Sequence, residues 1–429
     1  MLTRARKIAC PNAGVAARGC TNTPESTEMT TARSENVNEV DQARMSAFRA
    51  TKGDGPIVVG PWLSEVGFEL LYWIPFVRSI LEFRAVDPAR LVTVTRGGAH
   101  VWYQQFGGTH LDILDLVPYV RYRDASAQRV EQQGGQKHVD LGELDEEILA
   151  AVRERVPVAA HNVLHPSSMY QMLRRLWGER DGFMAVDQYL KYQPLDAASV
   201  PEVPGLRLPP DYVAVRFYHS PSFPATPENQ DFACRTIEQL AQRTPVVLLN
   251  NGLVMDDHVE VQLPVGPGIH RVTEAMTPAN NLAVQTAVVA KATAFYGTYG
   301  GFSYLAPFYG VPAVGYYSDP SQFKHMHLSL AYRVFLQEGY GAFLPMNVKD
   351  VPRIAQAAPA ATPVVRSPRR ARHNASAALP PPIGPDAMND VADDGRAQPG
   401  ASGGTASRRV SGRNSTTARF AASAGLTPP

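Results

Sequence analysis

The chain has 429 residues, of which 44% are hydrophobic and 19% are charged, and 41 Lys and Arg side chains face 40 Asp and Glu for a net charge of +1. This composition is typical of a globular protein, and the neutral balance excludes a chain built to coat nucleic acid phosphates. Three cysteines and the lack of a long apolar run exclude a disulfide framework and a membrane-spanning helix. We therefore expect a cytoplasmic protein, and a peripheral membrane contact stays open.

Composition divides the chain into four parts. Residues 1–53 and 358–429 are rich in small, polar and charged residues or proline, and we expect both to be disordered extensions. Whether residues 1–53 are translated stays open. Between the extensions, a proline-rich linker near residue 200 separates an N-terminal domain, 54–200, from a C-terminal domain, 201–357.

The N-terminal domain begins with a strand followed by a helix. An apolar run at 56–60 predicts a buried strand, and apolar residues at helical spacing over 64–81 predict a helix. Pro75 should kink or interrupt that helix. Further strands are expected at 91–95 and 111–117, and further helices at 144–156 and 167–177.

The C-terminal domain alternates short apolar strands with helices. Strands are expected at 211–218, 245–251, 269–273, 292–297 and 312–317, and helices at 231–242, 279–290 and 301–309. Such alternation is typical of a parallel sheet covered on both faces. The predicted fold class is therefore α/β, with two Rossmann-like domains facing a cleft.

In open parallel sheets, ligands bind at the carboxyl ends of the strands. Thr298, Gly300, Gly301 and Ser303 lie where a strand passes into a helix, and the unpaired amides of a helix start attract an anion. Arg216 ends another apolar strand, where its guanidinium suits a phosphate. The alternatives are a tight packing turn for the glycines and an ion pair with a nearby acid for the arginine.

The polar loop after the next strand contains Asn250, Asp256 and Asp257. These side chains suit the base and ribose of a nucleotide, and a polar turn without a ligand is the alternative. Their spacing does not place metal ligands on one face, so we predict no metal here. In the N-terminal domain, Glu65 and Glu69 are candidates for a catalytic base, although a carboxylate at Glu65 also stabilises a helix start.

Four segments in chain order carry a family resemblance: SEVGFE, VAVRF, LLNNGLVMDDH and FYGTYGGFSYLAPFYGVP. Together they resemble the GT-B class of glycosyltransferases, most closely its fucosyltransferase-like branch. The resemblance implies that Arg216 and the turn from Gly300 to Ser303 hold a donor diphosphate, and that Asp256 or Asp257 holds the nucleoside. The branch's His-x-Arg-Arg pattern is absent around Arg216, which leaves the donor open.

The resemblance implies transfer of a hexosyl or fucosyl-type sugar from a nucleotide-diphosphate sugar to a glycan or small hydroxyl acceptor, in polysaccharide biosynthesis and without a cofactor or metal. The late glycine stretch has no carboxylate of the kind found in many retaining members, which favours inversion. A noncatalytic module that binds a nucleotide or a glycan and a nucleotide-sugar epimerase stay open as alternatives. The sugar, the nucleotide, the acceptor, the oligomeric state and the presence of activity also stay open.

Overall fold

The computed structural model of the protein describes residues 40–133, 137–177, 183–250, 252–253, 259–323 and 325–353. The chain divides into two units, Met1–Val348 and Lys349–Pro429, and every strand and helix named below lies in the first. The predicted disordered tail, 358–429, lies outside the described residues, and the predicted domain boundaries stay predictions.

Residues 40–50 form a helix, so the prediction of a disordered extension over 1–53 was wrong for this segment. Ala43, Ala47 and Ala50 are buried in the main hydrophobic core. Their spacing of four and three residues places them on one face of the helix. This short stripe of alanines lies among polar residues, which is why composition alone concealed it.

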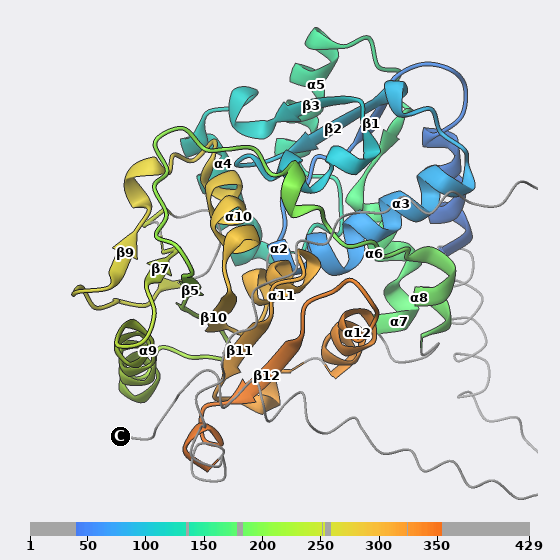
Figure 1. Ribbon diagram of the computed structural model, residues 1–429. Helices are drawn as coiled ribbons and strands as arrows, with labels where there is room; N and C mark the ends of the chain where they lie inside the picture. The colour runs from blue at the N-terminus through green and yellow to red at the C-terminus, as the bar shows by residue number, and fades with distance from the viewer. Residues whose placement is uncertain are drawn as a thin grey trace, which may run out of the picture. The chain divides into compact units, whose positions relative to one another are not determined.

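The first sheet is parallel and has the strand order β3-β2-β1-β4. Figure 1 shows β3, β2 and β1 side by side. Its strands are β1 (Ile57–Val59), β2 (Leu91–Thr95), β3 (Thr109–Asp112) and β4 (Val163–Leu164). The helices of this half are α2 (Val66–Phe68), the π-helix η1 (Glu69–Trp73), α3 (Ile74–Phe83), α4 (Tyr119–Gln133), α5 (Glu143–Arg155), α6 (Pro166–Met172), α7 (Arg174–Trp177) and α8 (Met184–Tyr189). Apolar side chains of this sheet are buried in two separate clusters, as expected for a parallel sheet covered on both faces.

A π-helical turn interrupts the α-helical hydrogen bonds of the first long helix just before Pro75. The helix continues through the π-helix η1, and Pro75 lies in the first turn of α3. A proline cannot donate to the carbonyl four residues earlier, which here belongs to Leu71. The hydroxyl of Tyr192 donates to that carbonyl at 2.8 Å, so the acceptor that the proline leaves open is satisfied.

The second sheet is parallel and has six strands in the order β12-β11-β10-β5-β7-β9. Its strands are β5 (Val213–Arg216), β7 (Val246–Leu248), β9 (Ile269–Arg271), β10 (Ala294–Thr298), β11 (Ala313–Tyr317) and β12 (Phe343–Asn347). The helices are α9 (Pro227–Ala241), α10 (Asn281–Lys291), α11 (Gly301–Phe308) and α12 (His325–Phe335), and a small antiparallel pair joins β6 (Tyr218–His219) to β8 (Val259–Glu260). The predicted α/β class with two Rossmann-like sheets is confirmed.

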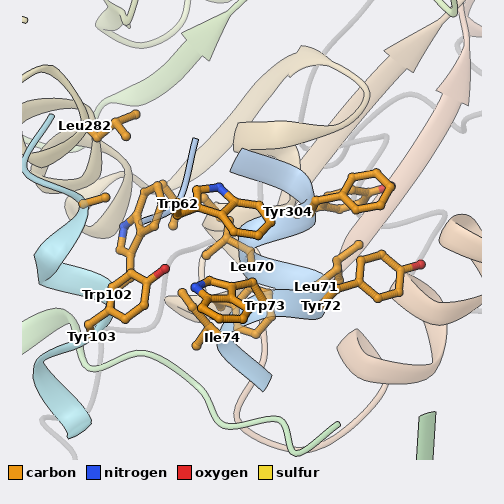
Figure 2. Close-up of a cluster of buried hydrophobic side chains, with 14 of the residues drawn as sticks. Trp62, Leu70, Leu71, Tyr72, Trp73, Ile74, Trp102, Tyr103, Leu282 and Tyr304 are labelled. Carbon is orange, nitrogen blue, oxygen red and sulfur yellow. The ribbon is translucent and has the colours of Figure 1, made fainter. Parts of the chain in front are cut away.

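One hydrophobic core joins helices that come from both halves of the chain. Figure 2 shows Leu282 of α10 and Tyr304 of α11 in the same buried cluster as Trp62 and Trp102 of the first half. The indole Nε1 of Trp102 donates to the hydroxyl of Thr286 at 3.0 Å. Trp62, like the neighbouring tryptophan and tyrosine of η1, is therefore a core residue.

Candidate functional site

The candidate site lies where the strand order of the second sheet reverses. From β5 the chain adds β7 and then β9 on one side, whereas β10, β11 and β12 are added on the other side. The reversal therefore falls between β5 and β10, which pair directly in parallel. Arg216 is the last residue of β5 and Thr298 is the last residue of β10, so both lie at the carboxyl edge beside the reversal.

Arg216 is 9% exposed and only partly satisfied by the protein. Its Nη1 donates to Oε1 of Gln285 at 2.6 Å, and its guanidinium carbon lies 4.6 Å from the ring centre of Phe302 and 5.8 Å from that of Tyr218. Its Nε is buried and has no partner among the described residues. Within that part of the chain the partner of Arg216 is thus an amide, not the acid that the alternative prediction required.

The glycine turn begins helix α11. Gly300 has φ 111° and ψ −166°, a conformation that essentially only glycine adopts, and it is the N-cap of the helix. A Cβ on Gly300 would lie 3.3 Å from the hydroxyl of Tyr218, and one on Gly301 would lie 3.5 Å from it. The first amides of an α-helix have no acceptor within the helix, so this turn offers N–H donors to an anion.

The hydroxyls of Thr298 and Ser303 are occupied by backbone groups. Thr298 Oγ1 accepts from the amide of Tyr218 at 3.0 Å and donates to its carbonyl at 2.7 Å. Ser303 Oγ accepts from the amide of Gly300 at 3.0 Å and donates to its carbonyl at 2.8 Å. Both side chains are buried and hold the shape of the turn, and their predicted contact with a ligand stays a prediction.

Asn250 follows β7 and is also buried at the carboxyl edge. Its Nδ2 donates to the carbonyl of Phe217 at 2.8 Å, whereas its Oδ1 is buried without a partner in the described part of the chain. Asp256 and Asp257 lie outside the described residues. Their predicted contact with a nucleoside therefore stays a prediction.

The glycine loop of the first half meets the glycine turn of the second half. A Cβ on Gly67 of α2 would lie 3.2 Å from the backbone nitrogen of Gly301, and α2 packs against α11 (Figure 1). Glu65, the half-buried N-cap of α2, lies two residues before this contact. Two motifs that are far apart in the sequence, SEVGFE and the late glycine stretch, thus lie side by side.

Glu69 lies in a different environment from Glu65. Its side chain is fully buried, and its carboxylate accepts from Arg96 Nη1 at 2.8 Å and from the Tyr103 hydroxyl at 2.6 Å. Arg96 Nη2 also donates to the carbonyl of Ser64 at 2.5 Å. Burial raises the pKa of the Glu69 carboxyl, and the two donors oppose this shift by stabilising the charged form. This arrangement favours a structural ion pair, and the catalytic role stays a prediction.

Sequence reasoning missed three residues around Arg216: Tyr218, Gln285 and Phe302. Gln285 is fully buried on α10, and its Nε2 donates to Oδ1 of Asn281 at 3.4 Å. A glutamine in the largely apolar segment NLAVQTAVVA is the signal that could have identified it, because a buried amide needs hydrogen-bond partners.

No family model and no curated protein matches the chain. The solved structures with a similar fold include a family 9 glycosyl transferase from Veillonella parvula, with 12% identity over 71% of this chain and 89% of that chain and a TM-score of 0.37. They include the E. coli heptosyltransferase WaaC with ADP, with 13% identity over 70% of this chain and 99% of that chain and a TM-score of 0.35. They also include a UDP-GlcNAc 2-epimerase from Methanocaldococcus jannaschii, with 9% identity over 70% of this chain and 99% of that chain and a TM-score of 0.24.

These identities and TM-scores are low, so the chemistry of this chain does not follow from them. The fold class rests on the two sheets described above, and the fucosyltransferase-like branch stays a prediction. Among the described residues, no helix has both the length and the apolar character needed to cross a bilayer.

Proposed function

We propose that this chain is a cytoplasmic glycosyltransferase that moves a sugar from a nucleotide-diphosphate sugar to a hydroxyl of a glycan or a small acceptor, in polysaccharide biosynthesis. In this proposal the transfer inverts the anomeric centre and needs no metal. The observation that carries it is Arg216, a buried cation without an acid partner among the described residues, beside the glycine-capped start of α11. Both lie at the strand-order reversal, where parallel sheets bind their ligands.

The proposed role of this edge is to stabilise the leaving diphosphate. Negative charge develops on the phosphate oxygens as the bond to the sugar breaks, and donors that are already in place stabilise it without reorganisation. The Nε–H of Arg216 and the first amides of α11 are such donors. The rings of Phe302 and Tyr218 beside the guanidinium restrict its position.

Glu65 is the better candidate for the base that accepts the proton of the acceptor hydroxyl. It is half-buried and lies two residues from Gly67, whose Cα faces the start of α11. Glu69 is fully buried, and both of its oxygens are engaged by Arg96 and Tyr103. A base needs a direct path to the proton that it takes, which favours Glu65.

The test is calorimetric titration of the full-length chain with UDP, GDP, ADP and dTDP and their sugars. Arg216→Ala should weaken binding of the preferred nucleotide by about 10-fold to 100-fold, because hydrogen bonds to charged groups contribute about 1.5–3 kcal/mol. The matched control is Arg235→Ala, which removes an exposed arginine paired with Asp231 on α9 and should leave the affinity unchanged. Equal affinity of Arg216→Ala and wild type would overturn the diphosphate role.

The pairing of Glu69 also favours the second candidate, a module that binds a nucleotide or a glycan without turnover. If Glu65 is not a base, Glu69 is the other carboxylate of the segment SEVGFE, and Arg96 and Tyr103 already engage it. Binding of a nucleotide sugar with no transfer to any acceptor would identify such a module. Release of an altered sugar without an acceptor would instead identify an epimerase.

A further inference from the structure

Two histidines and an aspartate converge at the carboxyl end of β4 in the first sheet. His138 precedes α5, Asp145 lies in its first turn, and His165 follows β4 directly. All three are buried, at 1%, 1% and 6% exposure. One ligand atom from each lies within 4.8 Å of the other two. Three separate segments of the chain thus direct nitrogen and oxygen donors to one buried point.

We propose that His138, Asp145 and His165 bind one divalent first-row transition metal, which clips the segment before α5 to the end of β4. Two imidazoles and one carboxylate are a donor set that zinc and iron both accept, whereas magnesium and calcium prefer oxygen donors. The inference does not depend on the proposed glycosyl transfer.

The two separations between the histidine nitrogens and the Asp145 oxygen are close to those of a tetrahedral site. Metal–ligand bonds of about 2.0–2.1 Å place neighbouring ligand atoms about 3.3 Å apart. His165 Nε2 lies 3.4 Å from Asp145 Oδ1, which fits without movement. His138 Nε2 lies 2.7 Å from the same oxygen, so this pair must open by about 0.6 Å, well within the reach of side-chain rotation.

The groups around the ligands suit a metal-bound state. The amide of Gly142 donates to Asp145 Oδ2 at 2.8 Å, which orients the carboxylate. Ser167 Oγ lies 2.8 Å from His165 Nδ1 and can accept the proton that this nitrogen carries when Nε2 binds a metal. The Ser167 amide donates to the same Nδ1 at 3.2 Å, so binding of a metal at Nε2 requires this helix-cap contact to break.

Hydrogen bonds within the protein do not satisfy this cluster completely. His138 Nδ1 is buried and has no partner among the described residues. In either neutral tautomer, therefore, only Nε2 of this ring makes a hydrogen bond within that part of the chain.

The experiment uses the full-length chain, stripped with a chelator and then dialysed against Zn²⁺. The expected result is one tightly held zinc per chain, measured by elemental mass spectrometry, with the affinity measured by competition against a chromogenic indicator. His138→Gln and His165→Gln should each weaken zinc binding by more than about 100-fold. Loss of a group that is hydrogen-bonded to a ligand weakens metal binding about 10-fold to 100-fold, and loss of the ligand itself should have a larger effect.

The matched control is His161→Gln, which removes an exposed histidine four residues before His165 and should leave zinc binding unchanged. The control matters because the chain has 11 histidines. Equal zinc affinity in all three variants, or no zinc retained by wild type, would overturn the proposal. Iron retained in place of zinc, with the same loss in the two variants, would support the site and identify its occupant.

A second measurement covers the case in which His138→Gln or His165→Gln fails to fold. X-ray absorption of the zinc-loaded wild-type chain should show a first shell of nitrogen and oxygen with the scattering of two imidazole rings. A first shell without imidazole would contradict the proposal, whatever the variants do.

Discussion

The carboxyl edges of the two sheets differ in whether a buried charge has a partner of opposite charge. In the first sheet, Glu69 and Arg96 are buried together, and Tyr103 donates to the same carboxylate. In the second sheet, Arg216 is buried with the amide of Gln285 as its partner, and its Nε is left without one among the described residues. A charge that the protein itself compensates contributes to the fold, whereas a buried cation without an anion is prepared for one that arrives with a ligand.

The largest expected effect comes from breaking the compensated pair of the first sheet. Glu69→Gln leaves Arg96 buried without its counterion, and loss of one member of a buried pair costs about 3–5 kcal/mol. The free energy of unfolding, measured in urea, should fall by this amount. Asp231→Asn is the control, since it removes an exposed pair with Arg235 and should cost at most about 1 kcal/mol.

If Glu69→Gln is as stable as wild type and only loses turnover, then Glu69 is a catalytic residue. In that case the buried charges at both edges serve function, and the contrast between the two edges is wrong.

A smaller effect is expected from straining the glycine turn of the second sheet. Gly300→Ala forces a residue with a Cβ to φ 111° and ψ −166°, which costs about 1–3 kcal/mol. Displacement of one helix-start amide from a bound phosphate would weaken nucleotide binding by about tenfold. Unfolding and calorimetric titration measure the two effects separately.

Gly205→Ala is the control for that strain, because Gly205 also has a positive φ, 77°, but a Cβ there meets nothing within 4 Å. It should lower stability by about 1 kcal/mol or less and leave nucleotide binding unchanged. Equal effects of the two substitutions on nucleotide binding would show that the glycine turn is not part of the ligand site.

The smallest effect concerns a histidine of the first sheet. Burial lowers the pKa of His110 on β3, and the nearby His100, whose ring centre lies 5.8 Å away, lowers it further. Because the folded-state pKa lies below the unfolded value of about 6.5, this contribution to stability is complete above that pH and is lost as the pH falls through the folded pKa.

His100→Gln should raise the pKa of His110 and reduce the acid-induced loss of stability, by less than about 1 kcal/mol. Ring-proton NMR titration and unfolding at pH 7 and pH 5 check this, with His161→Gln as the control. An unchanged pKa for His110 in His100→Gln would show that burial alone causes the shift.

Much of the fold follows from local patterns. The run LVTVT predicts a strand at 91–95, which is β2, and the late glycine stretch predicts the start of a helix at Gly301, which is where α11 begins. The elements that these patterns did not predict include α4, α8, α12, β4, β8 and β12. Strand β4 has only two residues and β12 contains a proline, so neither carries a strong alternation signal.

The sequence by itself determined the α/β class and placed Arg216 and the glycine turn at strand ends, because side-chain periodicity and glycine conformation depend on neighbours within a few residues. Only the tertiary structure decided which charges are compensated. Glu69 meets Arg96 across 27 residues, and Arg216 meets Gln285 across 69. The same is true of the three segments that bring His138, Asp145 and His165 together. Such pairings depend on the crossovers between parallel strands, and no local pattern in a single sequence records them.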